Sequence, residues 1–115
     1  MELRFDESVR NGSGSIQAFA NDAPVGLLVI MGETPEVLYW QRHYKVINVR
    51  YQLRNESTFL HVVNGLRQYK DKHGFRYLAV WTIGDGIGAN VDPEVLEKAG
   101  FKPLANMHPD CLYLE

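Results

Sequence analysis

The sequence predicts a single α+β domain with a mixed, mostly antiparallel β-sheet, one long helix and one short helix. Several short segments alternate or are continuously apolar, as β-strands are, whereas one central stretch repeats its apolar residues at helical spacing. Because strands are expected on both sides of the long helix, the chain must cross over between two of them, so part of the sheet is parallel. A chain of 115 residues supports one hydrophobic core and leaves little room for a second domain.

The first third of the chain is expected to form a hairpin. Ser15–Ala20 alternates weakly and Val25–Met31 is an apolar run, and turn-forming residues from Asn21 to Pro24 separate them. A second break at Gly32–Pro35 precedes Val37–Trp40. The aromatic residues of that segment either extend the sheet or begin a short excursion from it.

The clearest alternating segment and the clearest helix follow. Tyr44–Val49 alternates between two faces and contains β-branched residues, which favours a strand. Ser57 or Thr58 is expected to cap a helix that ends at His73 and Gly74. Its apolar face consists of Phe59, Val62, Val63, Leu66 and Tyr69. Its outward residues are expected to be Arg67, Lys70 and Lys72.

The last third predicts strand, loop, short helix and strand. Tyr77–Ile83 is an apolar and β-branched run bounded by glycines, which favours a buried strand. The loop Gly84–Gly88 lacks the GxGxxG spacing, so we predict a connection and not a dinucleotide site. Asp92 should cap a helix that ends at Gly100, and Cys111–Leu114 should form the terminal strand.

Composition and charge exclude several classes of partner. Twelve basic against fourteen acidic residues give a net charge of -2, which argues against a nucleic-acid or anionic-membrane partner. No apolar run approaches the roughly 18 residues of a membrane span. The single cysteine, Cys111, cannot form an internal disulfide, and His61, His73 and His108 show no metal-ligand spacing. We expect a cytoplasmic protein without a metal site.

Three pieces of the second half carry a resemblance to a known family. They are a strand end that reads VINVRYQLRNES, a helix that reads TFLHVVNGLRQYKDKHGF, and a short helix that ends in PEVLEKAGFKP. Over Tyr44 to Leu114 the chain resembles the GCN5-related N-acetyltransferases (GNAT). The resemblance implies a short GNAT-like domain over residues 1–115 that lacks the N-terminal helices of the usual fold.

The resemblance also implies a binding site for acetyl-coenzyme A. In this family a V-shaped opening between two parallel strands exposes backbone groups to the acyl arm, a role that would fall to Val49. The following turn directs amide groups at the pyrophosphate. By position, the residues of that turn are Arg54, Asn55, Glu56, Ser57 and Thr58. Asn90 lies near the position of a cofactor-contacting asparagine.

The chain departs from the family pattern at three positions. Ser57 and Phe59 stand where the phosphate-binding turn has glycines, and a bulky phenylalanine there could fill the space of a phosphate. Glu56 adds negative charge nearby. Leu96 stands where many members have a tyrosine that protonates the departing thiolate, and leucine carries no proton to donate.

The activity that the resemblance implies is transfer of an acetyl group from acetyl-coenzyme A to an amine of a small molecule or a protein. The amine must be neutral to react, so a general base is expected nearby. His43 is the first candidate because imidazole titrates near neutrality. Glu33 and Glu36, on the preceding turn, are the next candidates.

The alternative is a catalytically inactive protein that uses this fold for protein–protein contacts. Small proteins that look like this one occur among phage-encoded virion components and host-directed factors, which would place it in the virion. Trp40 and Tyr44 belong to an aromatic cluster of the kind enriched at protein interfaces. A homo-oligomer stays open under either hypothesis.

Overall fold

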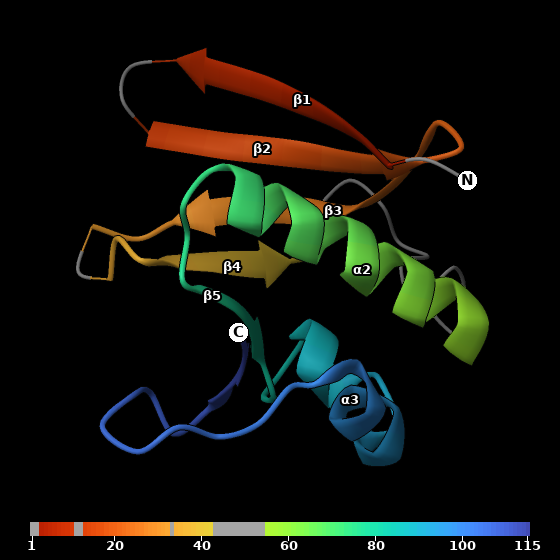
Figure 1. The fold of residues 1–115 in the computed structure, drawn as a ribbon, viewed down its shortest axis with the longest axis vertical. Coiled ribbons are helices and arrows are strands. Elements are labelled where there is room, and N and C mark those ends of the chain that lie inside the picture. The colour runs from red at the N-terminus through yellow and green to blue at the C-terminus, as the bar shows by residue number, and fades with distance from the viewer. Residues whose placement is uncertain (1–2, 11–12, 33, 43–54) are drawn as a thin grey trace.

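The computed structural model describes residues 3–10, 13–32, 34–42 and 55–115. It has six strands in one sheet, together with two α-helices and a short 3-10 helix (Figure 1). The strands are β1 (Leu3–Arg10), β2 (Ser13–Ala20), β3 (Ala23–Ile30), β4 (Val37–Gln41), β5 (Tyr77–Trp81) and β6 (Cys111–Leu114). The helices are α2 (Glu56–Lys72), α3 (Pro93–Ala99) and the 3-10 helix η1 (Ile87–Ala89). The predicted α+β class is therefore confirmed.

The six strands lie in sequence order, and four of the five neighbouring pairs are antiparallel. The exception is the parallel pair of β4 and β5, which the chain connects through α2. This pair is the predicted crossover. The strand before it, however, is Val37–Gln41, whereas the predicted strand Tyr44–Val49 lies outside the described residues. Of the two alternatives for Val37–Trp40, extension of the sheet is correct.

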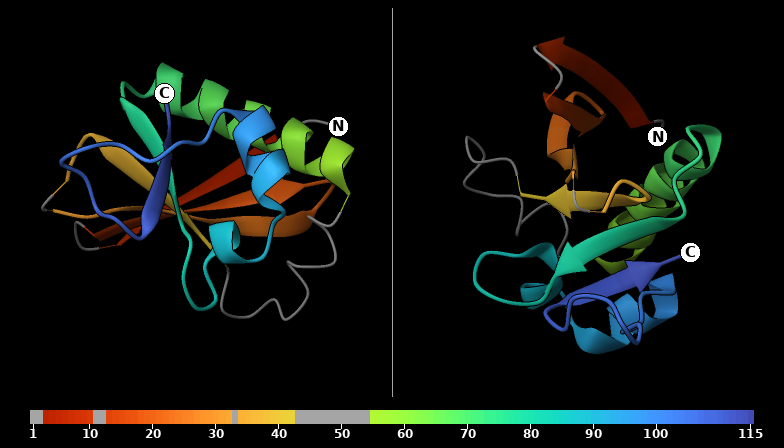
Figure 2. Two further views of the ribbon diagram at one scale, coloured as in Figure 1. Left: turned by 90° about the horizontal axis from the view of Figure 1, so that it is seen from below. Right: turned by 90° about the vertical axis from the view of Figure 1, so that its left-hand side faces the viewer.

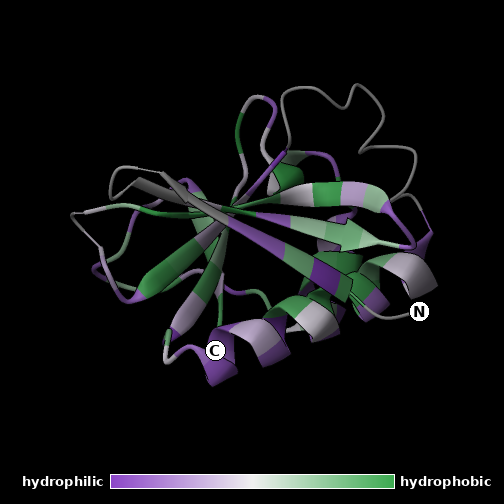
Figure 3. Ribbon diagram, turned by 90° about the horizontal axis from the view of Figure 1, so that it is seen from above, coloured by the Kyte–Doolittle hydropathy of each residue, from purple (hydrophilic) through white to green (hydrophobic). Residues whose placement is uncertain are grey.

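Two hydrophobic clusters cover the two faces of the central strands. Along β4, Leu38 and Trp40 belong to the larger cluster with both helices, and Val37 and Tyr39 belong to the smaller one. The smaller cluster is completed by β5, β6 and residues of the segment 102–110. Both helices thus lie on one face of the sheet (Figure 2), and α2 carries hydrophobic and hydrophilic residues around its circumference (Figure 3). Burial on both faces explains why β4 has no polar alternation.

The predicted hairpin is formed by β2 and β3, with a tighter turn than expected. Only Asn21 and Asp22 form the turn, and their positive φ values of 50° and 63° suit a two-residue hairpin. Ala23 and Pro24 already belong to β3. The proline is tolerated because the β2–β3 register shifts beside it, between Ala18 and Phe19.

Strand β1 was not expected from the sequence. Leu3 and Phe5 face α2, as alternation requires, but the next inward position is Glu7. The Tyr69 hydroxyl donates a 2.6 Å hydrogen bond to the Glu7 carboxylate. Burial and this bond raise the pKa of Tyr69 well above its usual value. The charged Glu7 at an inward position breaks the apolar alternation from which a strand is predicted. Its partner Tyr69 lies 62 residues away in the chain, so the local sequence does not show that the carboxylate is satisfied.

The long helix begins earlier than predicted. Asn55, and not Ser57 or Thr58, is its N-cap: the Asn55 Oδ1 accepts hydrogen bonds from the Ser57 amide (2.9 Å) and the Thr58 amide (3.3 Å). The end is as predicted, with His73 at the C-cap and Gly74 at a φ of +78°. All five residues of the predicted apolar face are buried.

The C-terminal elements agree with the prediction apart from the end of β5 and the 3-10 helix η1, which begins at Ile87 inside the predicted loop Gly84–Gly88. Asp92 caps α3 through the Glu94 amide, and Gly100 adopts a left-handed conformation after it. Cys111–Leu114 is a strand. Strand β5 ends at Trp81, and Ile83 is 53% exposed.

Lys70 was expected to point outward, but its side chain is only 3% exposed. Its ammonium group donates to the Asp71 carboxylate (2.6 Å) and to the carbonyls of Phe75 (3.4 Å) and Arg76 (3.3 Å). These carbonyls lie in the turn that leads from α2 into β5. The buried ammonium is stable here because it has three acceptors for its three N–H groups, all within six residues of Lys70 in the chain.

The first prediction concerns this lysine. Lys70→Met should lower the free energy of unfolding by about 1–3 kcal/mol, because the Phe75 and Arg76 carbonyls lose their donor. Lys72→Met, the same substitution at an exposed position of the same helix, should change it by less than about 0.5 kcal/mol. Urea unfolding measures both. Equal effects of the two substitutions would contradict the assignment.

The second prediction concerns pH. The hydrogen bond from Lys70 holds the pKa of Asp71 below its usual value. Because the folded-state pKa is the lower one, the carboxylate stabilises the fold above the unfolded-state pKa and loses that contribution as the pH falls. Asp71→Asn should therefore be less stable than the wild type at pH 7, and the difference should be smaller at about pH 3, where the carboxylate begins to be protonated. Urea midpoints at both pH values test this; a pH-independent difference would contradict it.

Candidate functional site

The strongest candidate site is the place where β4 and β5 separate. Their parallel register pairs run from Val37–Tyr77 to Tyr39–Ala79 and stop there. Each strand nevertheless continues for two residues, β4 to Gln41 and β5 to Trp81. The carboxyl ends of two neighbouring parallel strands are thus not paired with each other. In open sheets that contain parallel strands, ligands bind in the crevice outside such carboxyl ends.

A cleft of about 400 Å³ occupies this position. Its lining comes from the end of β4, the end of β5 and the loop that follows β5. The lining residues are Trp40, Gln41, Arg42, Trp81, Ile83, Gly84, Asp85 and Gly86. We call it the strand-end cleft. Two segments that are about 40 residues apart in the chain meet there.

The backbone at the end of β5 points toward this cleft. The Thr82 amide donates a 2.8 Å hydrogen bond to the Asp110 carbonyl on the β6 side, whereas the Tyr77 amide donates to Glu36 on the β4 side. Backbone groups of successive residues in a strand point alternately to its two neighbours. By this alternation the N–H and C=O of Trp81 point toward β4, at the level where the β4–β5 ladder has ended.

The two tryptophan side chains leave the space between the strands free because they lie on opposite faces of the sheet. The Trp40 indole is fully buried on the helix side, where its Nε1 donates to the Val25 carbonyl (3.0 Å). The Trp81 indole packs between Tyr39 and His108 on the other side. Neither indole therefore projects into the space between the two strand ends.

The glycines of the loop after β5 let it turn back against the strand. A Cβ atom at Gly86 would collide with the carbonyl of Trp81, and Gly88 is similarly close. The Gly86 carbonyl accepts hydrogen bonds from the Ala89 amide (3.1 Å) and from Nδ2 of Asn90 (2.8 Å). Asn90, predicted as a cofactor contact, thus uses its side-chain amide to hold the wall of the cleft.

An ion pair spans the mouth of the strand-end cleft. Arg42, which follows β4, lies 3.8 Å from the carboxylate of Asp85 in the loop. The Asp85 side chain is 83% exposed, so the pair contributes little to stability. It places one cationic and one anionic group within reach of a polar ligand.

The start of α2 has a different arrangement from the predicted phosphate-binding turn. The amides of Ser57 and Thr58 are already bonded to the Asn55 side chain. Glu56 pairs with Lys98 of α3 at 2.8 Å, and this contact raises the pKa of Lys98. Phe59 is fully buried and stacks on Trp40, so its ring does not block the space in front of the helix.

Glu36 is exposed in the turn before β4, where its carbonyl accepts from the Arg76 and Tyr77 amides. The other predicted site residues fall into two groups. Glu33, His43, Tyr44, Val49 and Arg54 lie outside the described residues. Leu96 lies in the core, and so does Trp40, whose side chain has no exposed surface to offer a partner. Residue patterns did not identify Gln41, Arg42 or Ile83 as cleft residues. Their position at strand ends was the signal that could have identified them.

Other kinds of site find no support in the part of the chain that the structure describes. It contains no group of three or more histidine, cysteine or acidic side chains placed to hold a metal ion. No helix there is long and apolar enough to cross a membrane. Burial raises the pKa of the Cys111 thiol, as expected for an unreactive cysteine. A second hollow, of about 390 Å³, lies between β1 and α2.

The third prediction tests the role of Asn90. Asn90→Ala should lower the stability by about 1 kcal/mol and speed hydrogen exchange of the Ala89 and Asn90 amides, because the loop loses its side-chain brace. Asn64→Ala, on the exposed side of α2, is the matched control and should leave this exchange unchanged. Unaltered exchange in Asn90→Ala would show that the side chain does not hold the loop.

Comparison of the chain with models of protein families, with curated proteins and with solved structures finds no match.

Proposed function

We propose that the chain is an N-acyltransferase that binds acyl-coenzyme A, with acetyl-coenzyme A as the expected donor, in the strand-end cleft and transfers the acyl group to an amine. The observation that carries the proposal is the end of the β4–β5 ladder at Tyr39 and Ala79, before either strand ends. Beyond these residues the two strands are not paired with each other, which gives an opening between parallel strands of the kind that the GNAT resemblance implies. The resemblance gave this role to Val49, which lies outside the described residues, so we assign it to the ends of β4 and β5.

The chemistry of the cleft suits a pantetheine arm. That arm is thin and carries two amide groups, which need backbone or amide partners and little side-chain bulk beside them. The N–H of Trp81, the side chain of Gln41 and the side-chain-free surface at Gly84 meet these needs, whereas the Trp81 carbonyl is covered by Gly86 and Gly88. Ile83 adds an exposed apolar contact.

The phosphates would lie toward α2, whose N-terminus favours anions. Burial of the Phe59 ring removes the steric objection that the sequence raised. The Asn55 cap occupies two amides that a phosphate would otherwise use, so a phosphate there would have to displace the Asn55 side chain or bind beside it. Arg42 and Lys98 are the described cations on the two sides of this region.

Acyl-coenzyme A supplies an acyl group activated as a thioester. The chain must hold it, position the amine and accept one proton from that amine. His43 remains our proposed base, on the residue chemistry that suggested it. The other candidates, Glu33 and Glu36, precede β4 in the chain, whereas the strand-end cleft lies where β4 ends. Leu96 lies in the core and has no proton to donate, so water would protonate the departing thiolate of coenzyme A.

A second function, that of a protein-binding domain without catalysis, has one observation in its favour. Asn55 satisfies the helix N-terminus internally, as in an ordinary capped helix with no phosphate to bind. Under this alternative the domain would act through protein contacts, as a phage-encoded virion component or host-directed factor would. It predicts no affinity for coenzyme A.

The fourth prediction separates the two. Calorimetric titration of the wild type with acetyl-coenzyme A and with free coenzyme A should show micromolar binding of both. Ile83→Arg should weaken binding at least about tenfold, because the longer side chain then occupies the strand-end cleft and the apolar contact of Ile83 is lost. Ile30→Arg is the matched control: Ile30 is also an exposed isoleucine, but it pairs with Leu38 near the other end of β4, so binding should persist.

Two results would overturn the proposal. Absence of heat and of thermal shift at millimolar coenzyme A would reject the binding site and favour the protein-binding alternative. Equal effects of Ile83→Arg and Ile30→Arg would reject its location. Where binding is found, release of free thiol from acetyl-coenzyme A with a panel of amines tests transfer, and no release above the protein-free rate would leave binding without catalysis.

A further inference from the structure

We propose that two copies of the chain pair through strand β1, antiparallel about a two-fold axis at Phe5, so that one continuous sheet runs through a dimer. The inference does not depend on the proposed function. It rests on an open sheet edge, on the direction of its backbone groups and on the order of charges along it.

The two edges of the sheet differ. The outer edge of β6 is closed by Lys102, whose amide donates to the Tyr113 carbonyl (3.0 Å) and whose carbonyl accepts from the Tyr113 amide (2.8 Å). Strand β1 forms the other edge and pairs only with β2 among the described residues. It is eight residues long, and it contains neither a proline nor a shift in register. Such an edge is a template for another strand.

The backbone register indicates which residues would form the new hydrogen bonds. Arg10 pairs with Ser13 across a two-residue connection, where the closing hydrogen-bonded pair of a hairpin stands. Alternate residues of β1 from Arg10 backward therefore bond to β2. The residues between them, among them Leu3, Phe5 and Glu7, direct N–H and C=O groups to the open edge.

The charges on β1 favour one alignment of two such edges. With the axis at Phe5, the residue Arg4 of each copy lies opposite Asp6 of the other, in non-hydrogen-bonded pairs where side chains are closest. An axis at Asp6 would oppose two aspartates, and one at Arg4 would oppose two arginines. An axis at Glu7 would oppose two glutamates, and one at Leu3 would shorten the overlap. An axis at Ser8 would oppose Asp6 with Arg10 but leave Arg4 without an acidic partner, so Arg4→Asp distinguishes it from the axis at Phe5.

The side chains in this alignment are available for contact. Arg4 and Asp6 are both exposed and lie on the face away from the helices. Arg4 lies over the Phe19 ring of its own chain (4.4 Å), and this contact orients the guanidinium. Arg4 also lies 3.7 Å from Asp22, but that carboxylate is 92% exposed, so the pair holds Arg4 only weakly. Phe5 is half-buried against Tyr69, so a second Phe5 would cover its remaining surface.

Charge reversal tests the pairing. In sedimentation equilibrium the wild type should show a monomer–dimer equilibrium. Asp6→Arg and Arg4→Asp should each weaken the dimer at least about tenfold, because each places like charges opposite each other twice. An equimolar mixture of the two variants should recover the dimer, since the mixed pair again places a cation opposite an anion at both contacts. Circular dichroism checks that both variants are folded.

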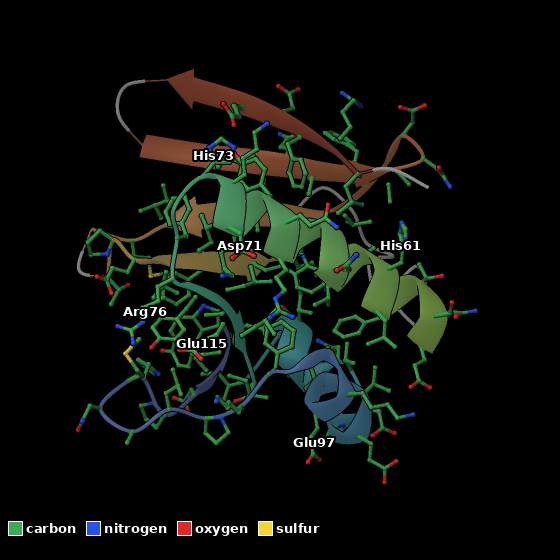
Figure 4. All side chains as sticks on the ribbon, in the orientation of Figure 1. His61, Asp71, His73, Arg76, Glu97 and Glu115 are labelled. Carbon is green, nitrogen blue, oxygen red and sulfur yellow. The ribbon has the colours of Figure 1, made fainter. Side chains whose placement is uncertain are left out.

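Glu97→Arg is the matched control. It makes the same change in net charge as Asp6→Arg but on α3, which lies far from β1 (Figure 4), and should leave the equilibrium unchanged. A wild type that stays monomeric at the highest soluble concentration would overturn the proposal. So would a dimer that survives both single reversals, or one that the mixture does not restore, because the dimer would then use another surface or register.

Discussion

The relative placement of strands β3 and β4 and helix α2 depends on the burial of one side chain, Trp40. Its indole is fully buried, bonds through Nε1 to the Val25 carbonyl of β3 and stacks on Phe59 of α2, with ring centroids 5.7 Å apart. Gly26 makes this possible, because a Cβ atom there would collide with the indole. One residue at the end of β4 thus fixes β3, β4 and the first turns of α2 relative to one another.

The candidate site follows from that constraint. The Trp40 side chain is held on the helix side, and neither Trp40 nor Gln41 has a register partner on β5. On the opposite strand Trp81 packs toward Tyr39 and His108, and the glycine loop folds against its carbonyl. The cleft is therefore a product of packing on both faces of the sheet, with strand-end backbone between the side chains of Gln41, Arg42, Ile83 and Asp85.

The sequence predicted the elements whose signals are local. The apolar face of α2, the Asp92 cap and the Gly74 and Gly100 ends all depend on neighbours within a few residues, and the structure has them as expected. Two features depended on distant partners and were missed: the inward Glu7 that bonds to Tyr69, and the strand ends that form the cleft. The buried Lys70 was missed for another reason, because two of its acceptors are backbone carbonyls of the turn after the helix, which residue types do not identify. Of the predicted site residues described, Asn55 and Asn90 have side chains that hold the backbone, a role that residue type alone does not distinguish from ligand contact.

The central claim is that separation of β4 from β5 creates a ligand site. The most direct measurement is an amide NMR titration of the wild-type chain with acetyl-coenzyme A. We expect the largest changes in chemical shift at the amides of Gln41, Arg42 and the segment from Trp81 to Gly86, with little change along β1 and β2. Saturating cofactor that leaves these amide signals unmoved, or that shifts the signals around the hollow between β1 and α2 instead, would contradict it.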